Sequence, residues 1–315
     1  MPPPPAWIPI GIGDDAAVIE PARGELDVLT TDSLIEGVHF RRDWTALDAV
    51  GYKALAVNVS DLAAMGAAPR AALLSLALPP DLALDAFDAL LDGFLRLATQ
   101  MNVPLAGGNL SQSPGPLVVD VTLLGSARRR RVLTRSAARP GDELYVTGSL
   151  GAAATGLAIR RNAQIDATVN AEFAACVARY ERPEPRLRWG LTVARNRAAS
   201  ACVDLSDGLA DAVTQIAEAS GVGAVVVAAE LPIHAGTTQW ATLTGGQAVP
   251  LAMSGGEDYE LLFAVPKKRR SRFLAIARAL KDVPVTRVGR VTAEPGLWLE
   301  RDGQIEPLGR GFVHF

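Results

Sequence analysis

The sequence contains only two cysteines, Cys176 and Cys202, and only four lysines in 315 residues. Two isolated cysteines form neither a disulfide framework nor a zinc site, and they suit a reducing compartment. No apolar run approaches the ~20 residues that span a bilayer. The N-terminus, Met1-Pro2-Pro3-Pro4-Pro5, lacks the basic and apolar regions of a signal peptide. We therefore predict a cytoplasmic protein with no membrane association.

The chain also lacks a large excess of charge of either sign, because 31 basic and 34 acidic residues give a formal net charge of −3. This balance gives no electrostatic reason to expect nucleic acid or an anionic membrane as a partner. The P-loop motif G-x-x-x-x-G-K-[ST] is absent, and so are the H-R-D and D-F-G motifs of protein kinases. If the protein handles phosphate, metal ions and arginine must neutralise most of the charge, since lysine is so rare.

Apolar residues make up 49% of the chain, which is typical of a globular core. Apolar runs predict strands at 27–31, 71–78, 117–125, 143–147, 224–229 and 259–265. Helical periodicity predicts helices at 48–66, 84–100, 208–220 and 269–281. The segment 297–307 is typical of a hairpin with Asp302-Gly303 at its turn. Strands and helices alternate, so we predict an α/β (α+β) fold.

The chain is long enough for about two domains. Proline and glycine interrupt the pattern at Arg139-Pro140-Gly141, and a new strand is predicted just after them. We therefore predict an N-terminal domain at 1–137 and a C-terminal α/β domain at 138–315.

Carboxylates follow several predicted strands and lie next to glycine or to hydroxyl residues. The ends of strands are where α/β folds bind ligands, and carboxylates that converge there repel one another unless cations neutralise them. Magnesium prefers such oxygen ligands, whereas a zinc site would need histidine and cysteine. The segments that carry these carboxylates are 11–15, 30–33, 58–61, 204–208 and 255–258.

Each of these carboxylates also has a structural interpretation. Asp14 and Asp15 could form a turn after Gly13. Asp204 and Asp207 could cap the helix predicted from Gly208. Asp61 could lie on a solvated helix face, and Glu257-Asp258 could be part of an ordinary loop. Only the joint occurrence of the motifs favours a metal site over these alternatives.

Taken together, the motifs resemble those of the thiamine-monophosphate kinase family, in the superfamily of aminoimidazole ribonucleotide synthetase. The matching segments run in order over nearly the whole chain, which makes the resemblance specific. They are GIGDDAAV (11–18), TTDSLIEGVHF (30–40), YKALAVNVSDLAAMGAAP (52–69), GGNLSQS (107–113), LTRSAARPGDELYVTG (133–148), VDLSDGL (203–209), SGGEDYELLF (254–263) and GFVHF (311–315).

The resemblance implies a two-domain fold whose N-terminal domain binds ATP and Mg²⁺ and forms a homodimer through its sheet. It implies direct in-line transfer of the γ-phosphoryl group of ATP to thiamine monophosphate, a step of thiamine diphosphate biosynthesis. Several Mg²⁺ ions would take part and no phosphoenzyme would form. A requirement for K⁺ stays open.

The resemblance also assigns roles to individual residues. Asp32, Asp61, Asp207 and Arg135 would carry catalysis. The residues expected to hold metal are Asp15, Thr30, Thr31, Asp32, Asp61, Asn109, Asp204 and Asp207. The residues expected to contact the nucleotide are Gly108, Asn109, Arg135 and Ser206, and those expected to contact thiamine monophosphate are His39, Glu257 and Phe312.

The sequence departs from the family pattern at Asn109, where many members carry aspartate. An amide oxygen can bind Mg²⁺ but adds no charge, so we expect a weaker metal site there. Other ATP-dependent enzymes of the superfamily and a non-catalytic Mg-nucleotide sensor are the alternatives. A sensor would be expected to lack several of the metal carboxylates, but Asp15, Asp32 and Asp61 are all present.

Overall fold

The computed structural model describes residues 5–13, 15–162 and 164–309. Within this range the chain forms two compact units, one of the residues up to Leu62 with Ala67–Arg130, and the other of Ala63–Gly66 with the residues from Arg131 onward. Each contains a mixed sheet and helices, which confirms the predicted α/β (α+β) class. No helix formed by the described residues combines the length and the apolar character that a bilayer span needs.

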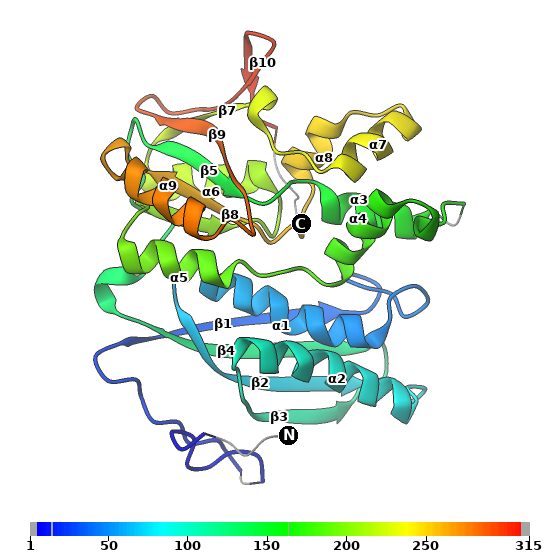
Figure 1. The fold of residues 1–315 in the computed structure, drawn as a ribbon. Helices are drawn as coiled ribbons and strands as arrows, with labels where there is room; N and C mark the ends of the chain where they lie inside the picture. Colours follow the sequence, from blue (N-terminus) through cyan, green and yellow to red (C-terminus); the bar gives the residue numbers. More distant parts are fainter. Residues whose placement is uncertain (1–4, 14, 163, 310–315) are drawn as a thin grey trace. The chain divides into compact units, whose positions relative to one another are not determined.

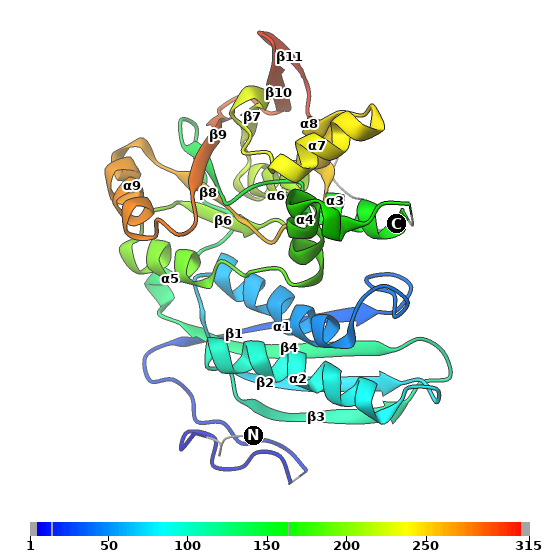
Figure 2. The same cartoon turned by 45° about the vertical axis from the view of Figure 1, so that its right-hand side comes forward.

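The first unit contains a four-stranded sheet in the order β1-β4-β2-β3. Figures 1 and 2 show helices α1 and α2 on one face of this sheet. The helices approach each other closely at two glycines, because a Cβ on Gly51 would lie 1.9 Å from Leu90 O and one on Gly93 would lie 1.8 Å from Asp48 O. The elements are β1 (Leu26–Ile35), α1 (Leu47–Ala64), β2 (Ala68–Leu78), α2 (Leu84–Met101), β3 (Leu105–Gln112) and β4 (Val118–Ala127).

The two faces of this sheet differ in character, because side chains alternate along each strand. Asp32 pairs with Val121, and Val121 pairs with Leu74, so these three residues share the face that the helices cover. The next row along the strands, Ser33, Asp120, Ser75 and Asn109, lies on the opposite face.

The second unit is built on a seven-stranded sheet in the order β11-β10-β7-β9-β5-β8-β6. Helix α6 packs on it through β6, β7 and β8, and Leu262 belongs to that core. The next residue on β8, Phe263, lies on the other face against Trp189 and Phe273. Aromatic residues of α5 and α9 therefore cover the second face.

The strands of this unit are β5 (Glu143–Thr147), β6 (Ala201–Asp204), β7 (Gly223–Val227), β8 (Leu261–Val265), β9 (Val285–Thr292), β10 (Leu297–Arg301) and β11 (Gln304–Pro307). Its helices are α3 (Ala152–Arg161), α4 (Ala171–Glu181), α5 (Leu187–Asn196), α6 (Leu209–Ser220), α7 (Ala235–Thr244), α8 (Ala248–Ser254) and α9 (Arg270–Ala279). The predicted hairpin is confirmed, and its turn residues Asp302 and Gly303 have φ of 50° and 77°, as a type I′ turn requires.

Candidate functional site

Thr30, Asp32 and Asp61 come together between β1 and α1. The hydroxyl of Thr30 donates a hydrogen bond to the Asp61 carboxylate. Asp61 is half-buried in α1, so its interpretation as a solvated helix position is wrong. Burial and the neighbouring carboxylates of Asp61 and Asp120 raise the pKa of Asp32 from 3.8 to about 7. A cation close to these oxygen atoms would offset the repulsion between the two carboxylates, and hydroxyl and carboxylate oxygens are ligands that Mg²⁺ prefers.

The side chain of Thr31 lies on the opposite face of the sheet from Thr30 and Asp32. Its hydroxyl is 3.4 Å from Asp120 Oδ1 and 3.2 Å from the Thr122 hydroxyl, and it donates to Val121 O at 3.1 Å. The structure therefore separates the two threonines of the TTD motif. The sequence analysis did not identify Asp120 as a candidate site residue. In an alternating strand, residues two positions apart share a face, so Asp120 and Thr122 could have indicated a row of polar side chains on one face of β4.

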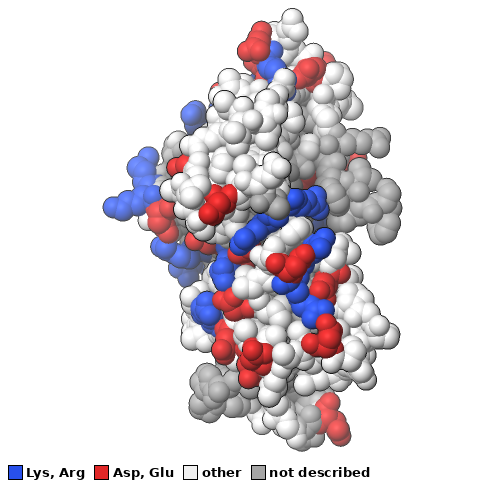
Figure 3. Space-filling model, turned by 90° about the vertical axis from the view of Figure 1, so that its right-hand side faces the viewer, with Lys and Arg blue, Asp and Glu red and all other residues white. Residues whose placement is uncertain are grey.

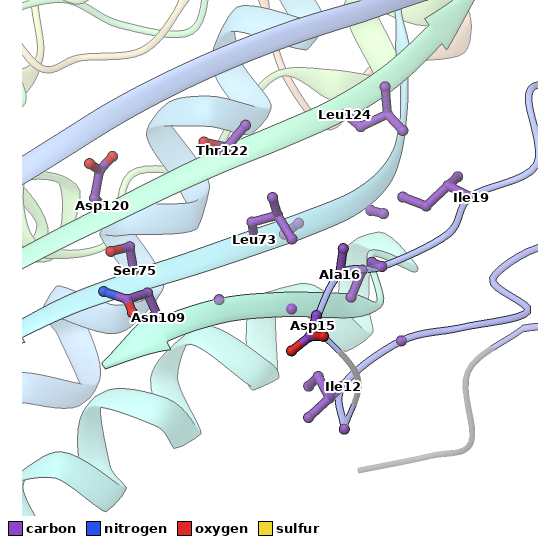
Figure 4. A pocket seen from close by; sticks show the side chains of 18 of the residues that line it. Ile12, Asp15, Ala16, Ile19, Leu73, Ser75, Asn109, Asp120, Thr122 and Leu124 are labelled. Carbon is purple, nitrogen blue, oxygen red and sulfur yellow. The ribbon is translucent and has the colours of Figure 1, made fainter. Parts of the chain in front are cut away.

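A cavity of about 670 Å³ lies on this open face. Figure 4 shows the side chains of Asp120, Ser75 and Asn109 along adjacent strands, with Asp15 on the N-terminal segment that borders the same cavity. Gly108 belongs to the lining too, and a Cβ there would lie 1.9 Å from Leu74 O, so the strand needs glycine at this position. The cavity thus brings Asp15, Gly108 and Asn109 together, apart from the Asp32 and Asp61 pair.

The VDLSDGL and SGGEDYE segments lie side by side in the second unit. Leu205 N donates to Glu260 O at 2.9 Å, and Glu257 N donates to Ser206 O at 2.7 Å. A Cβ on Gly256 would lie 2.6 Å from Ser206 O, so glycine is required for this approach. The backbone of Glu257 therefore lies directly against the loop that carries Ser206 and Asp207.

Asp204 and Asp207 take different positions around this loop. Asp204 is buried at the end of β6, and Asp207 accepts a hydrogen bond from the Ser206 hydroxyl at 2.9 Å. Helix α6 begins after Gly208, its N-cap residue, and has no side-chain cap there. Since Asp204 lies within a strand, it is not a helix cap.

Arg135 lies near the same helix. Its carbonyl accepts a hydrogen bond from the Ser220 hydroxyl at 3.1 Å. Burial raises the pKa of Asp211, and the positive charge of the exposed Arg135 guanidinium offsets part of this rise. The guanidinium therefore lies within electrostatic range of Asp211 in the first turn of α6.

His39 follows β1 in a short turn of the first unit. Its Nδ1 accepts a hydrogen bond from Ile35 N at 3.0 Å, which holds the half-buried ring in place. Phe312, the third residue expected to contact substrate, lies outside the described residues.

No group of three or more histidine, cysteine, aspartate or glutamate side chains gathers closely enough to hold a metal, as far as the described residues go. Mg²⁺ usually takes only one or two protein carboxylates and completes its shell with water and substrate phosphate. On the face in Figure 3, acidic and basic side chains are interspersed rather than separated by sign.

Family models match both halves of the chain. The model for the N-terminal domain of AIR synthase related protein matches residues 13–127, and the model for the C-terminal domain matches residues 139–300. A thiamine-monophosphate kinase of Escherichia coli strain K12 is 39% identical over 98% of this chain and 92% of its own length.

Two solved structures resemble the chain over most of its length. One is thiamine-monophosphate kinase from Stenotrophomonas maltophilia K279a, with a TM-score of 0.85, 40% identity, and coverage of 95% of this chain and 92% of that one. The other is described as AaThiL complexed with AMPPCP and TMP, with a TM-score of 0.81, 33% identity, and coverage of 96% and 92%.

Proposed function

We propose that this protein uses ATP to phosphorylate thiamine monophosphate to thiamine diphosphate. The chain belongs to the AIR synthase related family and, within it, to the thiamine-monophosphate kinases. The observation that carries this function is the match to a structure described as holding both AMPPCP and TMP, over 96% of this chain. The protein is a kinase of thiamine diphosphate biosynthesis.

Bound Mg²⁺ ions would neutralise phosphate charge so that two anions can approach each other. The proposed ligands are Thr30, Asp32 and Asp61 in one group, Asp15, Thr31 and Asn109 from the open face, and Asp204 and Asp207 in the second unit. The raised pKa of Asp32 supports this assignment, because a cation would relieve the repulsion among its neighbours. Whether the reaction also requires K⁺ is measured in the assay described below.

The remaining residues bind and orient the two substrates. Gly108, Asn109, Arg135 and Ser206 receive the nucleotide, and His39, Glu257 and Phe312 receive thiamine monophosphate. The acceptor is a phosphate that is mostly ionised at neutral pH, so transfer needs alignment and charge neutralisation more than a general base. We therefore propose in-line transfer with Asp32, Asp61, Asp207 and Arg135 as the catalytic residues and no phosphoenzyme.

We propose a homodimer formed through the open face of the first sheet. Leu29 is 70% exposed and Leu73 is 44% exposed, and both line the cavity on that face, where contiguous exposed apolar surface is typical of an interaction site. The division into 1–137 and 138–315 and a cytoplasmic location belong to the same proposal. The location is supported by Cys176 and Cys202, which are both free and buried.

The function is tested by incubating the protein with thiamine monophosphate and ATP while Mg²⁺ and K⁺ are varied. The expected products are thiamine diphosphate and ADP in equal amounts, separated by chromatography. ATP consumption without thiamine diphosphate would point to another member of the superfamily. ATP binding without any turnover would favour the nucleotide sensor.

A further inference from the structure

Asp258 is a buried carboxylate, 1% exposed, that none of the proposed roles uses. Its Oδ2 accepts a hydrogen bond from Gly151 N at 2.6 Å, and its Oδ1 accepts one from Ala153 N at 3.0 Å. These donors belong to the start of α3, whose N-cap residue Gly151 has no side-chain cap. Asp258 therefore caps a helix that begins more than a hundred residues earlier in the chain.

The two neighbours of Asp258 have an unusual backbone. Glu257 has a φ of 68° and Tyr259 a φ of 49°, a left-handed region that L-residues rarely adopt outside constrained sites. Three hydrogen bonds hold this backbone, from Glu257 N to Ser206 O, from Tyr259 N to Leu205 O, and from Arg179 Nη2 to Asp258 O. The first two tie the segment to the VDLSDGL loop, and the side chain of Asp258 ties it to the start of α3.

We propose that Asp258 is a positioning residue, which fixes Glu257 in its left-handed conformation beside Ser206 by anchoring the loop to the start of α3. The inference rests on the proposed function only for the ligand that Glu257 receives, thiamine monophosphate. The anchoring is a property of the fold, and it can be measured without turnover.

The test compares Asp258→Asn with a variant that weakens α3 elsewhere. An asparagine side chain can accept from only one of the two amides, because its NH₂ group donates. Thr155→Val is the matched control in α3. It removes a buried hydrogen bond between the hydroxyls of Thr155 and Thr237 of α7, which are 3.0 Å apart. Asp258→Ser, which keeps a single hydroxyl acceptor, takes the place of the Asn variant if that variant does not fold.

We expect Asp258→Asn to raise the KM for thiamine monophosphate about tenfold, which is roughly one decade in apparent affinity for this substrate. The KM for ATP should rise less than about twofold. Combined with Glu257→Gln, the same change should add less than about twofold, because Asp258 acts through Glu257. Thr155→Val should lower Tm and leave both KM values unchanged. Additive effects in the double variant, or an equal rise in KM for Thr155→Val, would overturn the inference.

Amide hydrogen exchange separates this inference from the proposed function. Exchange at Gly151, Ala153 and Glu257 should be at least about tenfold faster in Asp258→Asn than in the parent, whether or not the protein turns over substrate. Unchanged exchange at these amides contradicts the anchoring, even in an active enzyme. Faster exchange in a protein without kinase activity supports the anchoring and rejects only the proposed ligand.

Discussion

The hydroxyl of Thr30 donates a hydrogen bond to the carboxylate of Asp61, which joins β1 to α1 across 31 positions of the sequence. Asp32 lies next to this pair and has a pKa raised to about 7, chiefly by burial and then by Asp61. A fold that placed these groups together only for stability would be expected to pair them with a basic side chain. This arrangement supports the proposal that the three side chains bind a cation.

Asp32→Asn should lower turnover by at least about 100-fold, because a metal carboxylate is lost. The same change should stabilise the metal-free protein at pH 8 by about 1 kcal/mol, since it removes a charge that the fold disfavours. Assays of turnover and urea unfolding in EDTA measure the two effects. Ser33→Ala is the control, because Ser33 is exposed on the opposite face of β1 and should change neither. Near-normal turnover of Asp32→Asn would rule out its metal role.

Asn109→Asp should lower the Mg²⁺ concentration needed for half-maximal activity several-fold, about one decade at most. The new carboxylate would add charge to a cavity wall that already contains Asp15 and Asp120. Titration of the initial rate with Mg²⁺ at saturating ATP measures this, with Asn109→Ala as the opposite control. An unchanged Mg²⁺ requirement in both variants would place Asn109 outside the metal shell.

Glu257→Gly should stabilise the protein by about 1 kcal/mol, because glycine adopts a φ of 68° without strain. The same variant should bind thiamine monophosphate at least about tenfold more weakly, since it loses the carboxylate. Glu257→Gln should weaken binding without the gain in stability. Urea unfolding and calorimetric titration with the substrate separate the backbone effect from the side-chain effect.

The pH dependence of stability should contain a contribution from Asp258. Burial raises the pKa of Asp258 from 3.8 to about 6 in the folded state, more than its two amide bonds lower it. A carboxyl with a raised folded pKa gives its full stability below pH 3.8 and loses it as the pH rises through 6. Relative to Asp258→Asn, the parent protein should therefore lose about 1 kcal/mol between pH 5 and pH 7.5. Parallel stability curves for the two proteins would contradict this.

Leu29→Lys should convert the proposed homodimer into a monomer, because it places a charge on the open face of the first sheet. Leu84→Lys is the matched control, since Leu84 is similarly exposed, at 74%, but begins α2 on the other side of that sheet. Sedimentation equilibrium should give half the parent mass for the first variant and the parent mass for the second. A monomeric parent protein would refute the dimer.

The sequence predicted only some of the strands and helices, and it missed β9 and the helices α3, α4, α5, α7 and α8. It placed β5 correctly at Glu143–Thr147 and the hairpin turn at Asp302-Gly303. It missed β3, because Gly107, Gly108 and Asn109 do not have the composition of a strand, and their place next to β2 depends on a parallel pairing that no local pattern reveals. The short strand β6 was missed for a related reason, since its four buried residues show no alternation.

The candidate site was predictable only as a set of residue types. Side-chain alternation in the predicted strand places Thr30 and Thr31 on opposite faces, but the sequence could not show that Thr30 meets Asp61 of α1 while Thr31 lies near Asp120 of β4. Nor could it separate Glu257 from Asp258, which are adjacent acids with different environments. Only the fold places Asp258 at the start of α3 while the backbone of Glu257 follows the Ser206 loop.

A single-turnover experiment with ATP labelled at the γ-phosphate tests the central claim most directly. With excess protein, Mg²⁺ and thiamine monophosphate, the label should appear in the terminal phosphate of thiamine diphosphate as fast as ATP disappears, and no label should stay on the protein after quenching. Label bound to the protein would contradict direct transfer. Label released as inorganic phosphate, with none in thiamine diphosphate, would contradict the assignment of thiamine monophosphate as the acceptor.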